Sequence, residues 1–389
     1  MTTLFTGTGR LLTPEPYAGE GPWVVVVDDG RFTWLGSASH APAADDRVDL
    51  GAALVTPGLV DAHTHPVYAG DRSDEAAARL SGAPYDGGGI LRTVAATRSA
   101  GDDELEALVA ARLRAQLAAG TTTVECKSGY GLSTVEESRA LRIIGRAAAG
   151  TPVRVVRTFL GAHARPPDDA TYVDRLVIEM VPAVAEAGLA EFCDVFCDEG
   201  FFSVADAERI LGAARSHGLG LRLHADQLAR TGAAELGVRL GATSADHLEQ
   251  LDEAGVAALA GSRTVATLLP GPALVMRDRL PPARALLDAG ATVALGSDAN
   301  AGTFGAWGAM PLVIGLAATL LGMTVVEALL AATSGAAAAL GLHGRRGVIG
   351  PGADADLVAW DAEHEGAFAL RLGAVRPLRT FVGGRDAGG

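Results

Sequence analysis

The sequence predicts an α/β fold: a (β/α)8 barrel of the TIM type, with a small β-sandwich built from both ends of the chain. Two patterns predict it. Between Leu54 and Asn300, short apolar runs rich in β-branched residues alternate with Ala/Leu-rich segments of helical spacing. The two ends contain instead strand-like runs broken by Gly and Pro turns. Near-continuous apolar strands that alternate with helices are typical of parallel strands with crossover connections.

The barrel strands are expected at eight apolar runs, a number that favours a closed barrel over an open sheet. In chain order, these runs are residues 54–60, 121–125, 153–160, 192–196, 219–223, 243–245, 265–269 and 292–295. Helices are expected between them, at residues 103–119, 135–149, 172–187, 204–216, 230–240 and 282–289. No G-x-G-x-x-G motif follows the first strand, which disfavours a doubly wound nucleotide-binding sheet.

The flanking segments have a different character. Their strand-like runs are residues 23–27, 31–35, 356–360 and 380–382. Pro57 and the glycine-rich stretch 344–352 mark the expected junctions. We therefore expect residues 1–56 and 347–389 to form one β-sandwich, beside a barrel of residues 57–346.

Composition narrows the class of protein. The 389 residues, 49% of them hydrophobic, supply a large buried core. The net charge of -14 argues against nucleic acid or an acidic membrane surface as a partner. The most apolar stretch, residues 309–321, is shorter than the ~20 residues that span a bilayer, and residues 1–10 lack the basic-then-apolar layout of a signal peptide. We expect a cytoplasmic protein with a small-molecule substrate.

Three rare residue types are informative. Cys126, Cys193 and Cys197 form neither a disulfide framework nor a paired Cys-x-x-Cys zinc knuckle, so we expect buried thiols. Lys127 is the only lysine among 32 basic residues, and Asn300 is the only asparagine. In a chain that otherwise avoids Lys and Asn, these positions favour a specific role over chance retention, because Arg and Lys are not interchangeable at demanding sites.

The strongest chemical signal is Asp61-Ala62-His63-Thr64-His65, directly after the first expected barrel strand. In a strand, residues i and i+2 point to the same side, so His63 and His65 can offer two imidazoles to one metal ion. They fall at the C-terminal rim, where barrel enzymes place their sites. Alone, the pair leaves open the alternative of two histidines that face the core.

The other strand ends strengthen the metal hypothesis. Five of the nine histidines lie at expected strand C-termini, and Asp298 follows the eighth strand; these histidines are His63, His65, His163, His224 and His247. Three neutral imidazoles and a carboxylate, with a water, suit one Zn²⁺ or iron ion. We expect His63, His65, His224 and Asp298 as the ligands. His247 and His163 are expected to take catalytic roles, because the ion needs an open position; a structural hydrogen bond remains the alternative for His247.

These residues resemble the amidohydrolase superfamily, whose barrels carry H-x-H on strand one, His on strands five and six, and Asp on strand eight. Residues 57–65 and 350–360 carry this likeness. Within the superfamily the chain resembles the imidazolonepropionase family, through segments 70–72, 87–90, 125–131, 159–163, 224–227 and 297–300. Two features depart from the family: the stretch 80–87 is short, and Ala301 stands where the family more often has Pro.

The resemblance implies an activity. It is hydrolysis of the ring lactam of 4-imidazolone-5-propanoate to N-formimidoyl-L-glutamate, by a homodimer. It also implies a single ion, Zn²⁺ or Fe²⁺/Fe³⁺, because binuclear relatives bridge two ions with a lysine on strand four. Here strand four ends in Cys197-Asp198-Glu199, and Lys127 follows strand two without a defined role.

The resemblance also implies roles for the site residues. Asp298 accepts the proton of the water and passes it to the ring nitrogen, and His247 stabilises the developing oxyanion. Arg72 grips the propionate with two parallel hydrogen bonds, the alternative being a surface ion pair. Further contacts with the substrate, for which core hydrogen bonds or a polar turn are the alternatives, are expected from Tyr130, His163, Gln227, Asn300, Gly302 and Thr303.

Two other hypotheses compete. A deaminase of a purine, pyrimidine or triazine ring usually has a general-acid Glu near the strand-five histidine, whereas the nearby residue here is Gln227. A non-catalytic binding protein on the same barrel is expected to have lost ligands, whereas all four candidates are present.

Overall fold

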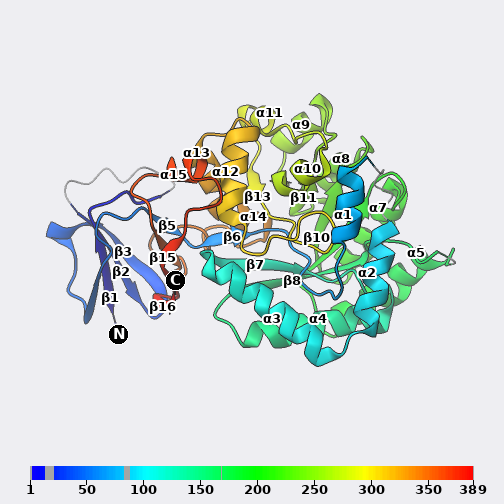
Figure 1. Cartoon of the computed structure of the whole chain (residues 1–389), viewed down its shortest axis with the longest axis horizontal. Helices are drawn as coiled ribbons and strands as arrows, with labels where there is room; N and C mark the ends of the chain where they lie inside the picture. The colour runs from blue at the N-terminus through cyan, green and yellow to red at the C-terminus, as the bar shows by residue number, and fades with distance from the viewer. Residues whose placement is uncertain (1, 14–21, 83–87, 168, 389) are drawn as a thin grey trace.

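An eight-stranded parallel barrel sheet, in the order β6 to β13, forms the centre of the molecule (Figure 1). The computed structural model describes residues 2–13, 22–82, 88–167 and 169–388. The barrel strands are β6 (Leu59–Asp61), β7 (Thr121–Lys127), β8 (Arg154–Ala162), β9 (Phe192–Cys197), β10 (Gly220–Ala225), β11 (Ser244–His247), β12 (Val265–Leu268) and β13 (Val293–Leu295). Each lies on an apolar run expected from the sequence, so the predicted fold class is confirmed.

The first expected run divides between two sheets. β5 (Val55–Pro57) pairs antiparallel with β14 (Leu357–Trp360), and β6 then starts the barrel. The prediction of one barrel strand over residues 54–60 is wrong in its first half, because an apolar pattern does not reveal to which sheet a strand belongs. Gly58 joins the two strands, and a Cβ there would lie 2.2 Å from Oγ1 of Thr122. The absence of a side chain lets the chain pass from one sheet to the other.

Backbone contacts between the first and the last barrel segments close the barrel just beyond β6 and β13. The amide of Asp298 donates to the carbonyl of His63 at 2.9 Å, and the amide of His65 donates to the carbonyl of Ala299 at 2.9 Å. Thr64 and Ala299 form a parallel bridge. This closure places the two segments that carry expected metal ligands side by side.

Helices surround the barrel (Figure 1). Those on expected segments are α3 (Asp102–Ala118), α4 (Thr134–Ala149), α5 (Tyr172–Arg175), η2 (Leu176–Met180), α6 (Val181–Glu186), α7 (Val204–Ser216), α8 (Ala233–Leu240) and α11 (Ala283–Asp288). The structure adds α1 (Ser73–Leu80), α2 (Gly88–Ser99), α9 (Glu253–Ala260), α10 (Pro270–Met276), α12 (Met310–Leu320), α13 (Val325–Leu330), η3 (Ala331–Gly335) and α14 (Ala336–Ala339). Side chains start several of them: Ser203 and Asp206, for example, form a capping box on α7.

Two four-stranded sheets lie beside the barrel (Figure 1). One consists of β1 (Thr3–Gly7), β2 (Trp23–Asp28), β3 (Arg31–Ser37) and β4 (Asp46–Asp49), and the other of β5, β14, β15 (Pro377–Val382) and β16 (Arg385–Gly388). Short helices η1 (Ala38–His40) and α15 (Ala367–Leu370) accompany them. The rings of Phe5 and Phe381 meet edge to face with centroids 4.9 Å apart. Residues from the two ends of the chain therefore share one apolar core.

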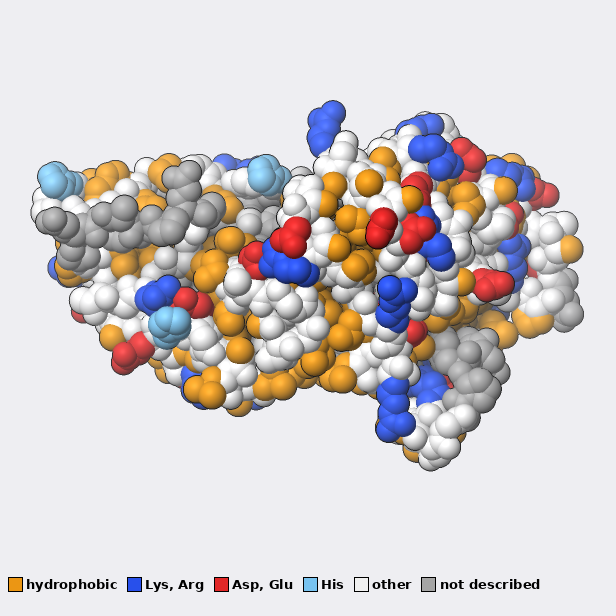
Figure 2. Space-filling model, turned by 90° about the horizontal axis from the view of Figure 1, so that it is seen from above, with side chains coloured by type: hydrophobic (Ala, Val, Ile, Leu, Met, Phe, Trp, Pro, Cys, Tyr) orange, Lys and Arg blue, Asp and Glu red, His pale blue; other side chains and the backbone are white. Residues whose placement is uncertain are grey.

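The surface mixes charges of both signs, as the face in Figure 2 shows. Exposed ion pairs are common; Nε of Arg146, for example, lies 2.6 Å from Oε2 of Glu106. Within the described part of the chain, no helix combines the length and apolar character that crossing a membrane requires. All three cysteines are buried free thiols, as expected.

Candidate metal centre

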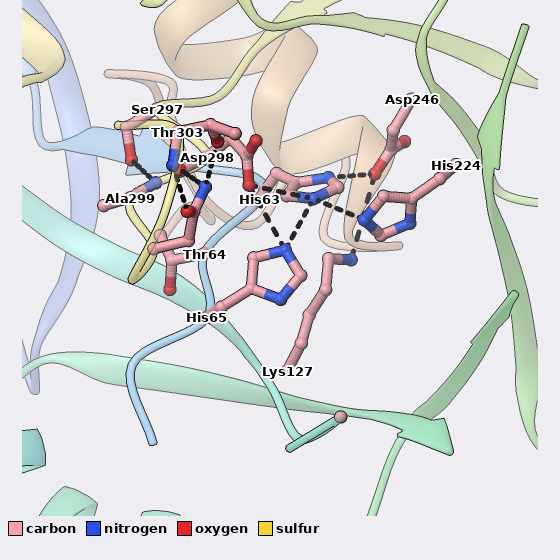
Figure 3. Close-up of polar contacts among 12 residues, drawn as sticks. His63, Thr64, His65, Lys127, His224, Asp246, Ser297, Asp298, Ala299 and Thr303 are labelled. Carbon is pink, nitrogen blue, oxygen red and sulfur yellow. Dashed lines mark hydrogen bonds and ion pairs between the residues drawn. The ribbon is translucent and has the colours of Figure 1, made fainter. Parts of the chain in front are cut away.

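Three histidine side chains converge at the C-terminal rim of the barrel (Figure 3). His63 and His65 follow β6, and His224 lies near the end of β10. Nε2 of His63 lies 3.2 Å from Nε2 of His65 and 3.1 Å from Nε2 of His224. All three side chains are buried. Their ligand nitrogens all lie within 4.8 Å of one another, as one shared ion requires.

The carboxylate of Asp298 lies beside this cluster. Its Oδ1 lies 3.2 Å from Nε2 of His65 and 3.6 Å from Nε2 of His63. Asp298 has a φ of +49°, a left-handed conformation that is rare for a residue with a side chain. The hydrogen bonds that close the barrel hold the backbone there. The structure thus brings the four expected ligands together.

Asp61, the first residue of the D-x-H-x-H segment, ties the ends of the barrel together. Its carboxylate accepts the amide of Ser297 at 2.9 Å, the hydroxyl of Ser297 at 2.6 Å and Nε2 of Gln116 at 2.8 Å. Burial raises the pKa of Asp61 to about 6; the hydrogen bonds to its carboxylate lower the pKa but only partly offset this effect. Because Ser297 precedes Asp298, this contact also helps to place the candidate ligand.

Two buried carboxylates orient the candidate ligands from behind. Nδ1 of His63 lies 2.6 Å from Oδ2 of Asp246, and Nδ1 of His224 lies 3.1 Å from Oδ1 of Asp194. A carboxylate that accepts the Nδ1 proton leaves the Nε2 lone pair free to bind a metal. Sequence reasoning missed both residues. Asp194 carried a signal of a buried charge, because it is the lone acidic residue inside the apolar strand β9, whereas Asp246 lies in the polar strand β11 and carried none.

The donor set fits a metal ion. Burial lowers the pKa of His63 well below its ordinary value and lowers that of His224 to about 4, so both imidazoles are neutral, as metal ligands must be. With both Nδ1 protons directed at carboxylates, the two Nε2 lone pairs face each other at 3.1 Å. A cation between them stabilises this arrangement. Three imidazoles and one carboxylate oxygen suit zinc or iron.

His247 lies next to the cluster, at the end of β11. Its ring centroid lies 5.2 Å from that of His224, and its φ is +80°. Nδ1 is buried and has no hydrogen-bond partner among the described residues; it lies 3.6 Å from Oε1 of Glu249. Burial lowers the pKa of His247, but the nearby carboxylates of Glu249, Asp298 and Asp246 together outweigh this effect and leave the pKa raised. The side chain is therefore suited to stabilise negative charge near the cluster.

A narrow pocket opens over the cluster. Its walls bring together ten of the expected site residues: His65, Arg72, Tyr130, His163, His224, Gln227, His247, Asp298, Asn300 and Thr303. Ile90 and Phe196 add apolar surface. Of the remaining expected residues, His63 is fully buried, and Gly302 packs on Arg72. Residues 83–87, in the stretch that is short for the family, lie outside the described residues.

Several pocket residues are already engaged within the protein. Nδ1 of His163 lies 3.0 Å from the carbonyl of Gly129, and its ring stacks on His65 with centroids 5.1 Å apart. The side chain of Asn300 binds its own loop: Oδ1 accepts hydrogen bonds from the amides of Gly302 and Thr303 at 2.7 and 2.9 Å. Asn300 therefore shapes the loop at the pocket wall, as the polar-turn alternative predicts.

Comparison with known proteins gives the family. A family model described as the amidohydrolase family matches residues 69–385. The chain therefore belongs to the amidohydrolase family. It is 46% identical to an imidazolonepropionase of Nocardia farcinica, over 98% of this chain and 97% of that relative. It is 44% identical to an imidazolonepropionase of a Polaromonas species, over 96% of this chain and 91% of the relative. The resemblance inferred from the motifs is confirmed.

Solved structures share the fold. An adenosine deaminase of Xanthomonas campestris with bound zinc has a TM-score of 0.75 at 21% identity, covering 99% of this chain and 92% of its own. A 5-methylcytosine deaminase of Klebsiella pneumoniae has a TM-score of 0.79 at 16% identity, covering 99% and 97%. At these identities the likeness concerns the fold alone. The family and the histidine cluster together indicate a metal ion.

Proposed function

We propose that this chain hydrolyses the ring lactam of 4-imidazolone-5-propanoate to N-formimidoyl-L-glutamate. One observation carries the proposal: three histidine Nε2 atoms and the Asp298 carboxylate converge beneath a pocket that also contains the guanidinium of Arg72. A metal-activated water suits a lactam carbonyl, and a fixed guanidinium suits a carboxylate tail. The relatives named imidazolonepropionase, which match over nearly the whole chain, support it.

We assign His63, His65, His224 and Asp298 as ligands of one Zn²⁺ or iron ion. When bound, the ion supplies a water of lowered pKa and polarises the ring carbonyl. The nitrogen and oxygen donors serve zinc and iron alike. A single ion is favoured because Lys127 lies directly behind the cluster, with Nζ 3.9 Å from Oδ2 of Asp246, and its positive charge opposes a second metal ion there.

The residues around the cluster divide the chemical work. Asp298 accepts a proton from the attacking water and returns it to the ring nitrogen that leaves. His247, whose pKa is raised, stabilises the developing oxyanion. Asp298 and His247 both line the pocket, so their side chains can contact a substrate bound there.

The pocket wall holds the substrate. Arg72 grips the propionate, and Tyr130 supplies a hydroxyl. His163 and Gln227 contact the amide edge of the ring. The loop of Asn300 contributes Gly302 and Thr303, whose amides point inward to the Asn300 side chain and thereby fix the loop against Arg72.

The assembly and location are proposals as well. The family resemblance supports a homodimer, which sedimentation equilibrium tests directly. A cytoplasmic location agrees with a metabolic small-molecule substrate, and fractionation of cells that produce the full chain tests it.

The deciding experiment is a substrate assay with metal quantified in the same sample. Zinc-loaded and iron-loaded protein are incubated with 4-imidazolone-5-propanoate, and the loss of its ultraviolet band is followed. Protein that carries one ion per chain and leaves the band unchanged would remove the proposal. Ammonia release from an aminated ring would instead favour a deaminase. The ligand assignment is tested separately by the metal content of His63→Ala and Asp298→Ala; a full complement of ion in both would contradict it.

A further inference from the structure

Lys127, the only lysine of the chain, lies behind the metal cluster and does not line the substrate pocket. It ends β7, and its side chain is fully buried. Nζ lies 2.7 Å from Oε1 of Glu125 and 2.7 Å from Oδ2 of Asp194. Figure 3 shows its ammonium pointing towards the side of the cluster formed by His224 and Asp246.

The contacts of Lys127 lead to all three candidate histidine ligands. Asp194, held by Lys127, accepts from both the amide and Nδ1 of His224 at 3.1 Å. Glu125, held by the same ammonium, accepts the amide of Thr64 at 3.2 Å, between His63 and His65. One ammonium therefore connects two carboxylates that fix a side chain on β10 and the backbone after β6.

Charge balance gives this arrangement its physical reason. Three fully buried carboxylates, Glu125, Asp194 and Asp246, share two fully buried cations, Lys127 and Arg222. Arg222 contacts Asp246 at 2.7 Å. Removing one partner of a buried charge network leaves an uncompensated charge, which is costly. Without Lys127 the carboxylates would repel one another and leave the positions from which they orient the histidines.

The geometry also explains why this position is a lysine in an arginine-rich chain. A compact ammonium can approach two carboxylates at 2.7 Å from one point. A guanidinium is larger and planar, and its donors lie further apart than those of an ammonium. Arg222 already occupies the neighbouring space, with its side chain fully buried.

We propose that Lys127 is a positioning residue of the metal centre: it holds Asp194 and Glu125 so that they fix His224 and the His63–His65 segment for metal binding. The proposal rests on the ligands assigned above and not on the identity of the substrate. It predicts a property of metal binding that can be measured without turnover.

The test compares Lys127→Met with a charge-compensated double variant, Glu125→Gln/Lys127→Met. The single variant leaves three carboxylates with one cation, whereas the double variant restores the wild-type excess of one negative charge. Zinc affinity is measured by competition with a chromophoric chelator, and the visible spectrum of the cobalt(II) form reports the geometry of the ligands. Glu125→Gln alone and Trp360→Phe, which loses the buried contact to Thr56, are the controls.

Lys127→Met is expected to bind zinc about 10- to 100-fold more weakly than wild type, as loss of a ligand-orienting contact does, with an altered cobalt spectrum. The double variant has the wild-type charge balance but lacks the ammonium that holds Asp194, so it is expected to bind zinc about 10- to 100-fold more weakly than Glu125→Gln. Trp360→Phe is expected to keep wild-type affinity. Wild-type affinity and spectrum in a folded Lys127→Met would overturn the proposal. If Lys127→Met does not fold, the double variant decides: failure to fold, or zinc affinity equal to that of Glu125→Gln, overturns the proposal. Wild-type protein that binds no zinc would refute the assigned ligands instead.

Discussion

Arg72 and Glu75 form a two-point ion pair at the edge of the pocket over the histidine cluster. Nε of Arg72 donates to Oε2 of Glu75 at 2.8 Å, and Nη2 donates to Oε1 at 2.7 Å. The guanidinium is buried, and it packs flat against Gly302. The alternative for Arg72 was an ion pair at the surface. The structure does contain an ion pair, but its guanidinium is buried and lies at the pocket wall.

Replacing Arg72 by Ala is expected to lower kcat/KM for the propionate-bearing substrate by about 10- to 100-fold, because a hydrogen bond to a charged group contributes about 1.5–3 kcal/mol. An analogue that lacks the propionate should be affected far less. Steady-state kinetics on both compounds measure the difference. Arg92→Ala, which removes an exposed pair with Asp74, is the matched control. Equal losses on the two compounds would refute the role of Arg72.

Gly302 is expected to be required for the position of Arg72. A Cβ at Gly302 would lie 2.3 Å from Cζ of Arg72, whereas one at Gly305 meets nothing closer than 3.9 Å. Gly302→Ala should therefore displace the guanidinium and lower kcat/KM on the order of 10- to 100-fold, as small misplacements at a site do. Gly305→Ala should stay near wild type. Similar kinetics for the two variants would show that the Arg72 position is not set by this contact.

Much of this architecture follows from local sequence patterns. β7 is predictable because its sequence begins with a run of β-branched residues, which favour strands, and the structure buries every position of this strand. Since all strands of a parallel barrel end at one rim, the strand-end rule brings His63, His65, His224 and Asp298 to one place. The pocket residues follow from the family motifs, and their roles stay predictions.

Other features depend on contacts that local patterns do not contain. Asp246 lies 183 positions from His63, and nothing near either residue signals the pair. Lys127 was notable only as a rare residue type, because its partner Asp194 is 67 positions away. α12 was missed for a different reason: seven of its residues are buried, five of them consecutive, so its sequence shows no helical alternation of apolar and polar residues.

The metal-free protein is expected to lose stability as the pH falls from 6.5 towards 4. Burial lowers the pKa of His224 from 6.5 to about 4, so the folded state resists a proton that the unfolded state accepts. This stability is fully present above pH 6.5 and is lost as the pH approaches the folded pKa. The loss from this group is about 3 kcal/mol, since one pKa unit corresponds to about 1.4 kcal/mol.

Urea unfolding of chelator-treated protein at pH 7 and pH 4.5 measures this effect. His224→Asn should show a smaller difference in unfolding free energy between the two pH values than wild type. The exposed His217, replaced by Asn, should leave the difference unchanged. Identical differences in wild type and His224→Asn would mean that His224 does not carry this pH dependence.

The contact between Asp61 and Ser297 is expected to stabilise the barrel closure and the position of Asp298 together. Ser297→Ala removes the 2.6 Å hydrogen bond from the hydroxyl to Oδ2 of Asp61 and the acceptor of the Ala299 amide at 3.1 Å. A buried acceptor or donor left unsatisfied costs about 1–3 kcal/mol. The free energy of unfolding of the metal-free protein should fall by that amount.

Zinc affinity should fall in the same variant, because Asp298 directly follows the altered residue and its φ of +49° depends on the backbone bonds of the closure. Ser216→Ala, which removes an exposed hydroxyl contact to Ala213, controls for the loss of a serine. A variant that loses stability but keeps wild-type zinc affinity would show that the closure stabilises the barrel without placing the ligand. A variant that loses neither would show that the amide of Ser297, which still donates to Asp61 at 2.9 Å, is sufficient for both.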